Sequence, residues 1–124
     1  MGHILIVEDD ADIRDSLTEV LNDVGFSAVS VPGAREALAW LETADPLPCL
    51  IFLDYMMPEM DGGQFMAVKR ELPRIAAIPV VIVSAVHNLA ERAAAVHADG
   101  FLRKPFDLED LLARARSFCP HMER

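Results

Sequence analysis

The sequence predicts an α/β fold: a doubly wound parallel sheet of five strands in the order 2-1-3-4-5, with five helices. Two observations predict it. Apolar stretches of strand length alternate five times with stretches whose apolar residues recur at helical spacing, which favours right-handed crossovers covering both faces of the sheet. One stretch, Cys49 to Leu53, is a run of five apolar residues that ends at Asp54, as expected for a strand buried on both faces.

The elements follow from local patterns and their punctuation. The expected strands are residues 3–7, 27–31, 49–54, 79–84 and 100–103. The expected helices are Ala11 to Val24 (capped by Asp10 or Asp12), residues 33–44, a helix from the 58–63 turn to Pro73, a helix from a capping box at Asn88 and Glu91 to about Ala98, and a helix from an Asp107 cap to Phe118. Their apolar residues, among them Leu72 and Leu108, are expected to face the sheet.

Composition bounds the function. The 124 residues, 52% hydrophobic and 25% charged, fit one globular domain over 1–124. A net charge of −9 opposes direct binding to nucleic acid. No apolar run is long enough to span a membrane, and the start of the chain at Met1 and Gly2 shows no secretion signal, so we expect a cytoplasmic protein. We accordingly expect Cys49 to be a small core residue and both cysteines to be reduced.

Polar residues follow four of the predicted strands. Acids follow the first strand, from Glu8 to Asp10, and Asp54, Ser84 and Lys104 come at or just after the third, fourth and fifth strands. Since ligands bind at the carboxyl ends of parallel strands, where the strand order reverses, these groups should share one crevice. Crowded carboxylates favour a hard cation such as Mg²⁺, and Asp54 beside it could form an aspartyl phosphate.

These residues resemble a known family. The acidic pair Glu8–Asp9, Asp54 followed by Pro58 and Gly62, Ser84–Ala85, and Lys104–Pro105–Phe106 occur in the order found in receiver domains of two-component response regulators. The resemblance covers essentially the whole chain and implies the flavodoxin-like form of the fold. It also implies a role for each matching residue. These are Asp54 as phosphoacceptor; Glu8, Asp9, Asp54 and the Met56 carbonyl as Mg²⁺ ligands; Ser84 and Lys104 as phosphoryl contacts; and a cis bond before Pro105.

The resemblance further implies partners and a switch. The phosphoryl donor would be a histidine kinase or a histidine phosphotransfer protein. Ser84 and the aromatic Phe101 would rearrange on phosphorylation and change the face formed by the fourth helix, the fifth strand and the fifth helix. Met56 and Val86 would lie beside the path of the hydrolytic water and could not orient it, which predicts slow autodephosphorylation.

The output remains open at this stage. Because the chain ends at Arg124, shortly after the last predicted helix, we expect a receiver that stands alone or is cut from a longer regulator, with output by protein binding. Arg92 and Asp110 match positions of a cross-dimer ion pair in DNA-binding regulators, but Gly100 departs from their pattern. We therefore expect a monomer before phosphorylation, with a homodimer possible afterwards.

Plainer roles and rival functions compete with this assignment. Asp10 is expected only to cap the first helix. A mononucleotide binder would need a Ser-, Thr- and Gly-rich loop in place of the acidic one, and a haloacid-dehalogenase-type phosphatase would need a second Asp where Met56 stands. A pseudo-receiver, which binds partners without phosphorylation, is the rival that the intact residue set makes improbable but does not exclude.

Overall fold

The computed structural model describes residues 3–120. Met1 and Gly2, on which the absence of a secretion signal partly rests, and residues 121–124, the end of the chain, lie outside the described residues. The sheet has five parallel strands in the order β2-β1-β3-β4-β5, which confirms the predicted topology. The strands are β1 (Ile4–Val7), β2 (Ala28–Val31), β3 (Leu50–Asp54), β4 (Val80–Ser84) and β5 (Gly100–Arg103).

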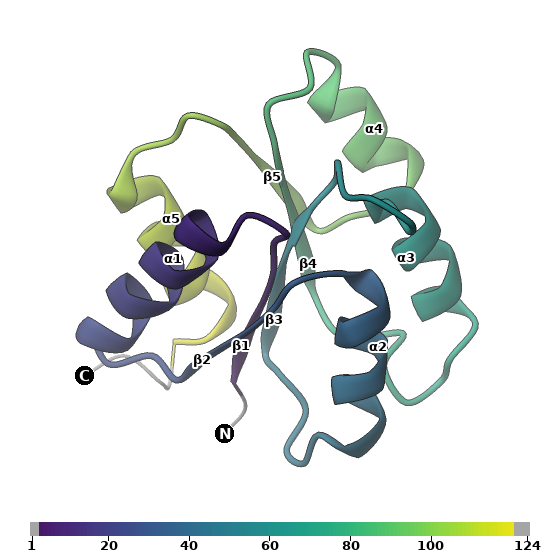
Figure 1. The fold of residues 1–124 in the computed structure, drawn as a ribbon, viewed down its shortest axis with the longest axis horizontal. Helices are drawn as coiled ribbons and strands as arrows, with labels where there is room; N and C mark the ends of the chain where they lie inside the picture. Colours follow the sequence, from purple (N-terminus) through teal and green to yellow (C-terminus); the bar gives the residue numbers. More distant parts are fainter. Residues whose placement is uncertain (1–2, 121–124) are drawn as a thin grey trace.

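Five helices cover the two faces of this sheet. They are α1 (Ala11–Asp23), α2 (Ala34–Thr43), α3 (Gly62–Arg70), α4 (Leu89–Ala95) and α5 (Leu108–Phe118). Figure 1 shows α1 and α5 on one side of the sheet and α2, α3 and α4 on the other. The sheet is therefore sandwiched between two helical layers, as the alternating pattern predicted.

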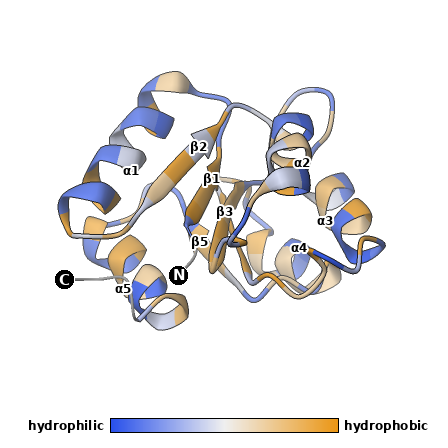
Figure 2. Ribbon diagram, turned by 90° about the horizontal axis from the view of Figure 1, so that it is seen from below, coloured by the Kyte–Doolittle hydropathy of each residue, from blue (hydrophilic) through white to orange (hydrophobic). Residues whose placement is uncertain are grey.

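The buried side chains form two apolar clusters, one on each face. Leu5 and Ile51 point toward the layer of α2, α3 and α4, whereas their strand neighbours Ile6 and Phe52 point toward α1 and α5. This alternation follows from the two-residue period of a strand. Figure 2 shows the strands as the most hydrophobic part of the molecule, and the apolar residues of β1, β3 and β4 are buried on both faces of the sheet.

The helix caps differ in part from the predictions. Asp10 caps α1 through a bond from the Ile13 N–H (3.1 Å), one of the two caps expected. Asn88 makes no capping bond, because its side-chain oxygen accepts from Arg92 Nε (2.8 Å), so the predicted capping box of α4 was wrong. The side chain of Asp107 also makes no capping bond to α5. A capping box that was not predicted joins Asp61 and Gln64 at the start of α3.

Two apolar residues expected to face the sheet are exposed. Leu72 lies past the end of α3, and Leu108 is the first residue of α5. Helical spacing places a side chain on one face of a helix but does not ensure that the sheet extends far enough to cover the helix end. The predicted end of the fourth helix was also wrong, since α4 ends at Ala95 and not near Ala98.

The expectation of reduced thiols was also wrong. Cys49 lies just before β3, is half-buried and forms a disulfide with the fully buried Cys119. The start of β3 and the end of α5 meet at the edge of the sheet opposite the carboxyl ends of the strands. A separation of 70 residues in sequence gave no sign of this proximity.

Within residues 3–120, no helix has the length and apolar character needed to cross a membrane.

Candidate functional site

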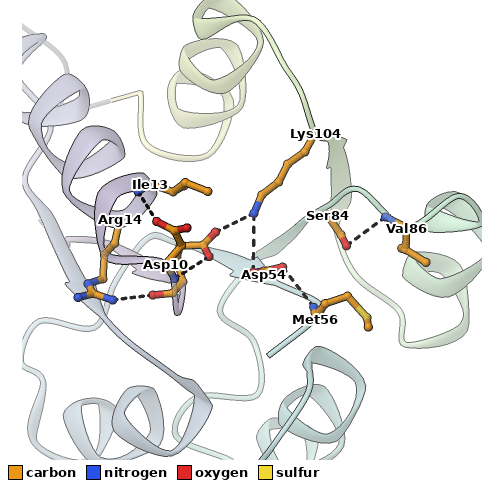
Figure 3. A network of polar contacts seen from close by, with 9 residues as sticks. Asp10, Ile13, Arg14, Asp54, Met56, Ser84, Val86 and Lys104 are labelled. Carbon is orange, nitrogen blue, oxygen red and sulfur yellow. Dashed lines mark hydrogen bonds and ion pairs between the residues drawn. The ribbon is translucent and has the colours of Figure 1, made fainter. Parts of the chain in front are cut away.

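Four strand ends meet at the carboxyl edge of the sheet. Glu8 and Asp9 follow β1, Asp54 ends β3, Ser84 ends β4, and Lys104 follows β5. Because β1 pairs with β3, and β3 with β4, these side chains emerge side by side. Figure 3 shows Lys104 reaching across the crevice toward Asp54, with Ser84 on the neighbouring strand.

Three carboxylates form a compact acidic cluster. Glu8, Asp9 and Asp54 each offer an oxygen, and these oxygens all lie within 4.8 Å of one another. Glu8 and Asp54 are buried, and Asp9 is exposed. Acids this close repel one another unless they are protonated or paired with a cation.

Lys104 supplies part of the compensating charge. Its Nζ lies 2.9 Å from Glu8 Oε1 and 3.7 Å from Asp54 Oδ2. Burial alone would lower the pKa of this lysine, but the hydrogen bond to Glu8 and the charge of Asp54 raise it above its usual range. Burial alone would likewise raise the pKa of Glu8, but the Lys104 and Asp10 hydrogen bonds hold it below its usual value. Both groups therefore stay charged at neutral pH.

Asp54 is less well compensated than Glu8. Burial and then the charge of Glu8 raise its pKa from 3.8 to about 7, against the opposing effect of Lys104. Its Oδ1 accepts a hydrogen bond from the Met56 N–H at 3.2 Å. A perturbed carboxyl among acids and a lysine is typical of a reactive or ligand-binding group.

The cluster fits a divalent cation of the Mg²⁺ type. All three side chains offer hard carboxylate oxygens, the donors that Mg²⁺ prefers. Burial and, after it, the charge of Glu8 raise the pKa of Asp54, and Lys104 offsets these two effects only in part. A cation bound here would offset the repulsion between Glu8 and Asp54.

The residues expected to act in the switch lie at the end of β4 and on β5. The Ser84 hydroxyl is turned toward the Val86 N–H, 3.4 Å away (Figure 3). Phe101 on β5 is 38% exposed, and Met56 beside Asp54 is 60% exposed. The bond between Lys104 and Pro105 is cis, the geometry that the resemblance implies.

Several residues that shape the site were not predicted. Arg14 in the first turn of α1 donates to the Glu8 carbonyl at 3.0 Å and so fixes the loop after β1. The guanidinium of Arg92 on α4 lies 5.2 Å from the centre of the Tyr55 ring, next to Asp54 in the chain. Tyr55 in turn packs so closely on Gly62 that a Cβ there would lie 2.9 Å from the Tyr55 Cα. Of these contacts, only that of Arg92 with Tyr55 joins segments far apart in the chain, whereas the Arg14 and Gly62 contacts lie within single loop-to-helix connections.

The comparisons with known proteins agree with this geometry. The family model described as "Response regulator receiver domain" matches residues 4–116. The chain is 38% identical to "Response regulator MprA" of Mycolicibacterium vanbaalenii over 92% of its own length and 48% of the relative's. It therefore spans about half the length of that relative.

Solved structures show the same fold. The chemotaxis protein CheY4 of Vibrio cholerae superposes with a TM-score of 0.84 at 29% identity, covering 95% of this chain and 98% of the other. The Mn²⁺-bound form of response regulator Rcp1 superposes with a TM-score of 0.76 at 26% identity, covering 100% and 98%. The latter structure places a divalent cation in a protein of this fold.

The strand order and the acidic cluster at the carboxyl edge define a flavodoxin-like α/β domain with a cation-type site. The chain belongs to the response regulator receiver domain family. It is thus a signalling domain of two-component systems, a family whose standard function is to be phosphorylated and to switch an output. Receiver domains bind Mg²⁺ through an acidic pocket, and they work with histidine kinases and output domains.

Proposed function

We propose that Asp54 is the residue of this chain that accepts the phosphoryl group, from a phosphohistidine of a histidine kinase or a phosphotransfer protein. The observation that carries the proposal is a buried carboxylate with Lys104 Nζ at 3.7 Å and two further acids within 4.8 Å. A carboxylate oxygen of Asp54 forms the new O–P bond as the N–P bond of the donor breaks and the imidazole leaves with the electron pair.

The neighbouring residues bind the cofactor and the transferred group. Glu8, Asp9, Asp54 and the Met56 carbonyl would hold Mg²⁺, which when bound neutralises the charge of the phosphoryl oxygens. Lys104, already charged and directed into the crevice, pairs with one phosphoryl oxygen. The Ser84 hydroxyl donates to another, after it leaves the Val86 N–H.

In this proposal, the domain signals by changing the shape of one surface and not by catalysing a reaction on another molecule. In this proposal the chain catalyses only its own phosphorylation and dephosphorylation. Movement of Ser84 makes room for Phe101, whose ring turns inward and alters the face formed by α4, β5 and α5. A downstream protein or an attached output domain would bind that face.

The remaining assignments concern the oligomeric state, nucleic-acid binding and cellular location of the domain. Arg92 is engaged by Asn88 and Tyr55, which favours a monomer over a dimer that pairs Arg92 with Asp110 before phosphorylation. A net charge of −9 supports the absence of direct nucleic-acid binding. We place the domain, 1–124, in the cytoplasm and off the membrane, where histidine kinases phosphorylate their partners.

Intact mass after incubation with Mg²⁺ and acetyl phosphate tests the assignment. We expect one added phosphoryl group on the parent protein, none on Asp54→Asn and none without a divalent cation. Asp61→Asn is the matched control, since Asp61 caps α3, and it should be phosphorylated like the parent. Phosphorylation of Asp54→Asn at the parent's level would contradict the assignment. If the parent gains no mass, incubation with a phosphorylated kinase and a Mg²⁺ titration separate a kinase-dependent receiver from a pseudo-receiver.

A further inference from the structure

Arg103, the last residue of β5, fixes the loop that follows the switch serine. Its Nη1 donates to the Val86 carbonyl at 2.7 Å, and its Nη2 donates to the His87 carbonyl at 3.3 Å. A guanidinium is a rigid fork that binds two acceptors at once. One exposed side chain therefore holds two successive peptide groups of the loop that connects Ser84 with α4.

Val86 is held from both sides in this arrangement. Its N–H donates to Ser84 Oγ at 3.4 Å, and its carbonyl accepts from Arg103 at 2.7 Å. The bond to Arg103 is the shorter of the two. Since the Ser84 hydroxyl is turned toward Val86 and not into the crevice (Figure 3), the position of Val86 bears directly on where that hydroxyl points.

The backbone of Ser84 itself has a different and independent anchor. Ser84 and Arg103 are register partners of β4 and β5, and the Lys104 N–H donates to the Ser84 carbonyl at 2.9 Å. These sheet contacts keep Ser84 in place whether or not the Arg103 side chain is present. The Arg103 fork therefore acts on the loop and the Ser84 hydroxyl, and not on the strand.

We propose that Arg103 is a positioning residue that favours this conformation of the loop at 85–88 and thereby restrains the turn of Ser84 toward a phosphoryl group on Asp54. The inference rests on the proposed function, because it assumes that Ser84 binds the phosphoryl group. Since the loop moves for that contact, the Arg103 hydrogen bonds to the Val86 and His87 carbonyls must break, or the Arg103 side chain must move with the loop. Removing the fork then raises the population of the binding-competent loop, and the apparent affinity for a phosphoryl mimic rises by the same factor.

Beryllofluoride with saturating Mg²⁺ is the probe, and its affinity is measured by calorimetry. We expect Arg103→Ala to bind about three- to tenfold more tightly than the parent, the effect of losing one or two exposed hydrogen bonds that favour one state. Arg103→Lys keeps the charge but not the fork and should lie between the two. Arg116→Ala is the control, because Arg116 pairs with Glu109 within α5 and its loss should leave the affinity unchanged.

Two further measurements separate positioning from a general structural role. Amide hydrogen exchange at residues 85–88 should become faster in Arg103→Ala without ligand, while the thermal midpoint stays within about 2 °C of the parent. In a Ser84→Ala background, which has no hydroxyl to turn, the gain from Arg103→Ala should shrink to less than about twofold.

The outcomes are distinguishable. Equal or weaker binding by Arg103→Ala, or a gain of the same size in the Ser84→Ala background, overturns this inference and leaves the proposed function intact. A parent protein that binds no beryllofluoride with Mg²⁺ overturns the proposed function and this inference with it.

Discussion

The disulfide between Cys49 and Cys119 allows a quantitative test of how this fold is stabilised. It ties the start of β3 to the end of α5 and closes a loop of 70 residues. In the chain-entropy description, such a cross-link removes about 15 cal/mol/K from the unfolded ensemble, which amounts to about 4.4 kcal/mol at 25 °C. With an unfolding entropy of about 0.26 kcal/mol/K for a chain of this length, its loss lowers the thermal midpoint by about 17 °C.

Reduction is the cleanest perturbation, because it removes the bond but no heavy atom and therefore creates no cavity. We expect urea unfolding of the oxidised protein to give a free energy of unfolding about 4 kcal/mol above that of the protein in a phosphine reductant. Alkylation of free thiols followed by mass measurement establishes the oxidation state of each sample. The Cys49→Ala/Cys119→Ala variant is the control, and the reductant should not change its midpoint.

A clear result refutes the reasoning. If the fully oxidised and fully reduced protein unfold within about 2 °C of each other, the cross-link does not restrict the unfolded chain as the loop length requires. Disulfides are rare in the cytoplasm, where we place this domain, so the fraction oxidised in freshly lysed cells is worth measuring in the same way.

Three further perturbations test the site and the fold. Since the folded pKa of Asp54, about 7, lies above its ordinary value of 3.8, the protonated carboxyl stabilises the folded protein below about pH 4, and this stabilisation is lost as the pH rises through 7. At pH 8 without divalent cation, urea unfolding should therefore give Asp54→Asn a free energy of unfolding above that of the parent by on the order of 1–2 kcal/mol. Equal free energies of unfolding would contradict this. Met56→Asn, which supplies an amide near the phosphoryl group, should lose phosphate on the order of ten times faster in a mass-based time course, and an unchanged rate would sink the slow-hydrolysis prediction. Asp61→Ala should lower the free energy of unfolding by about 1 kcal/mol through loss of the capping box, whereas Asp107→Ala, whose side chain makes no capping bond, should cost clearly less; equal losses would contradict this account.

Much of the fold was predictable because its signals are local. Buried parallel strands need continuous apolar runs, and all five predicted strands form within one residue of their expected bounds. The doubly wound order 2-1-3-4-5 suits the count of five strands and five helices, and the sheet has that order. Helix ends were less predictable, because the Asn88 side chain can cap its helix or bind a neighbour, and Arg92 decided between the two.

The placement of the site residues was predictable for the same reason. Parallel strands bring their carboxyl ends to one edge, so polar residues at four strand ends had to meet there, and Glu8, Asp54 and Lys104 do lie within contact distance.

The sequence by itself determined the order and type of the elements, the edge at which the site lies and the residues gathered there, because each of these depends on periodicity and on chain direction. Only the tertiary structure decided the contacts between segments far apart in the chain: the bond between Cys49 and Cys119, the contact of Arg92 with Tyr55, and the hold of Arg103 on Val86. Such contacts depend on distances across the packed molecule to within an ångström or two, and no local pattern encodes them.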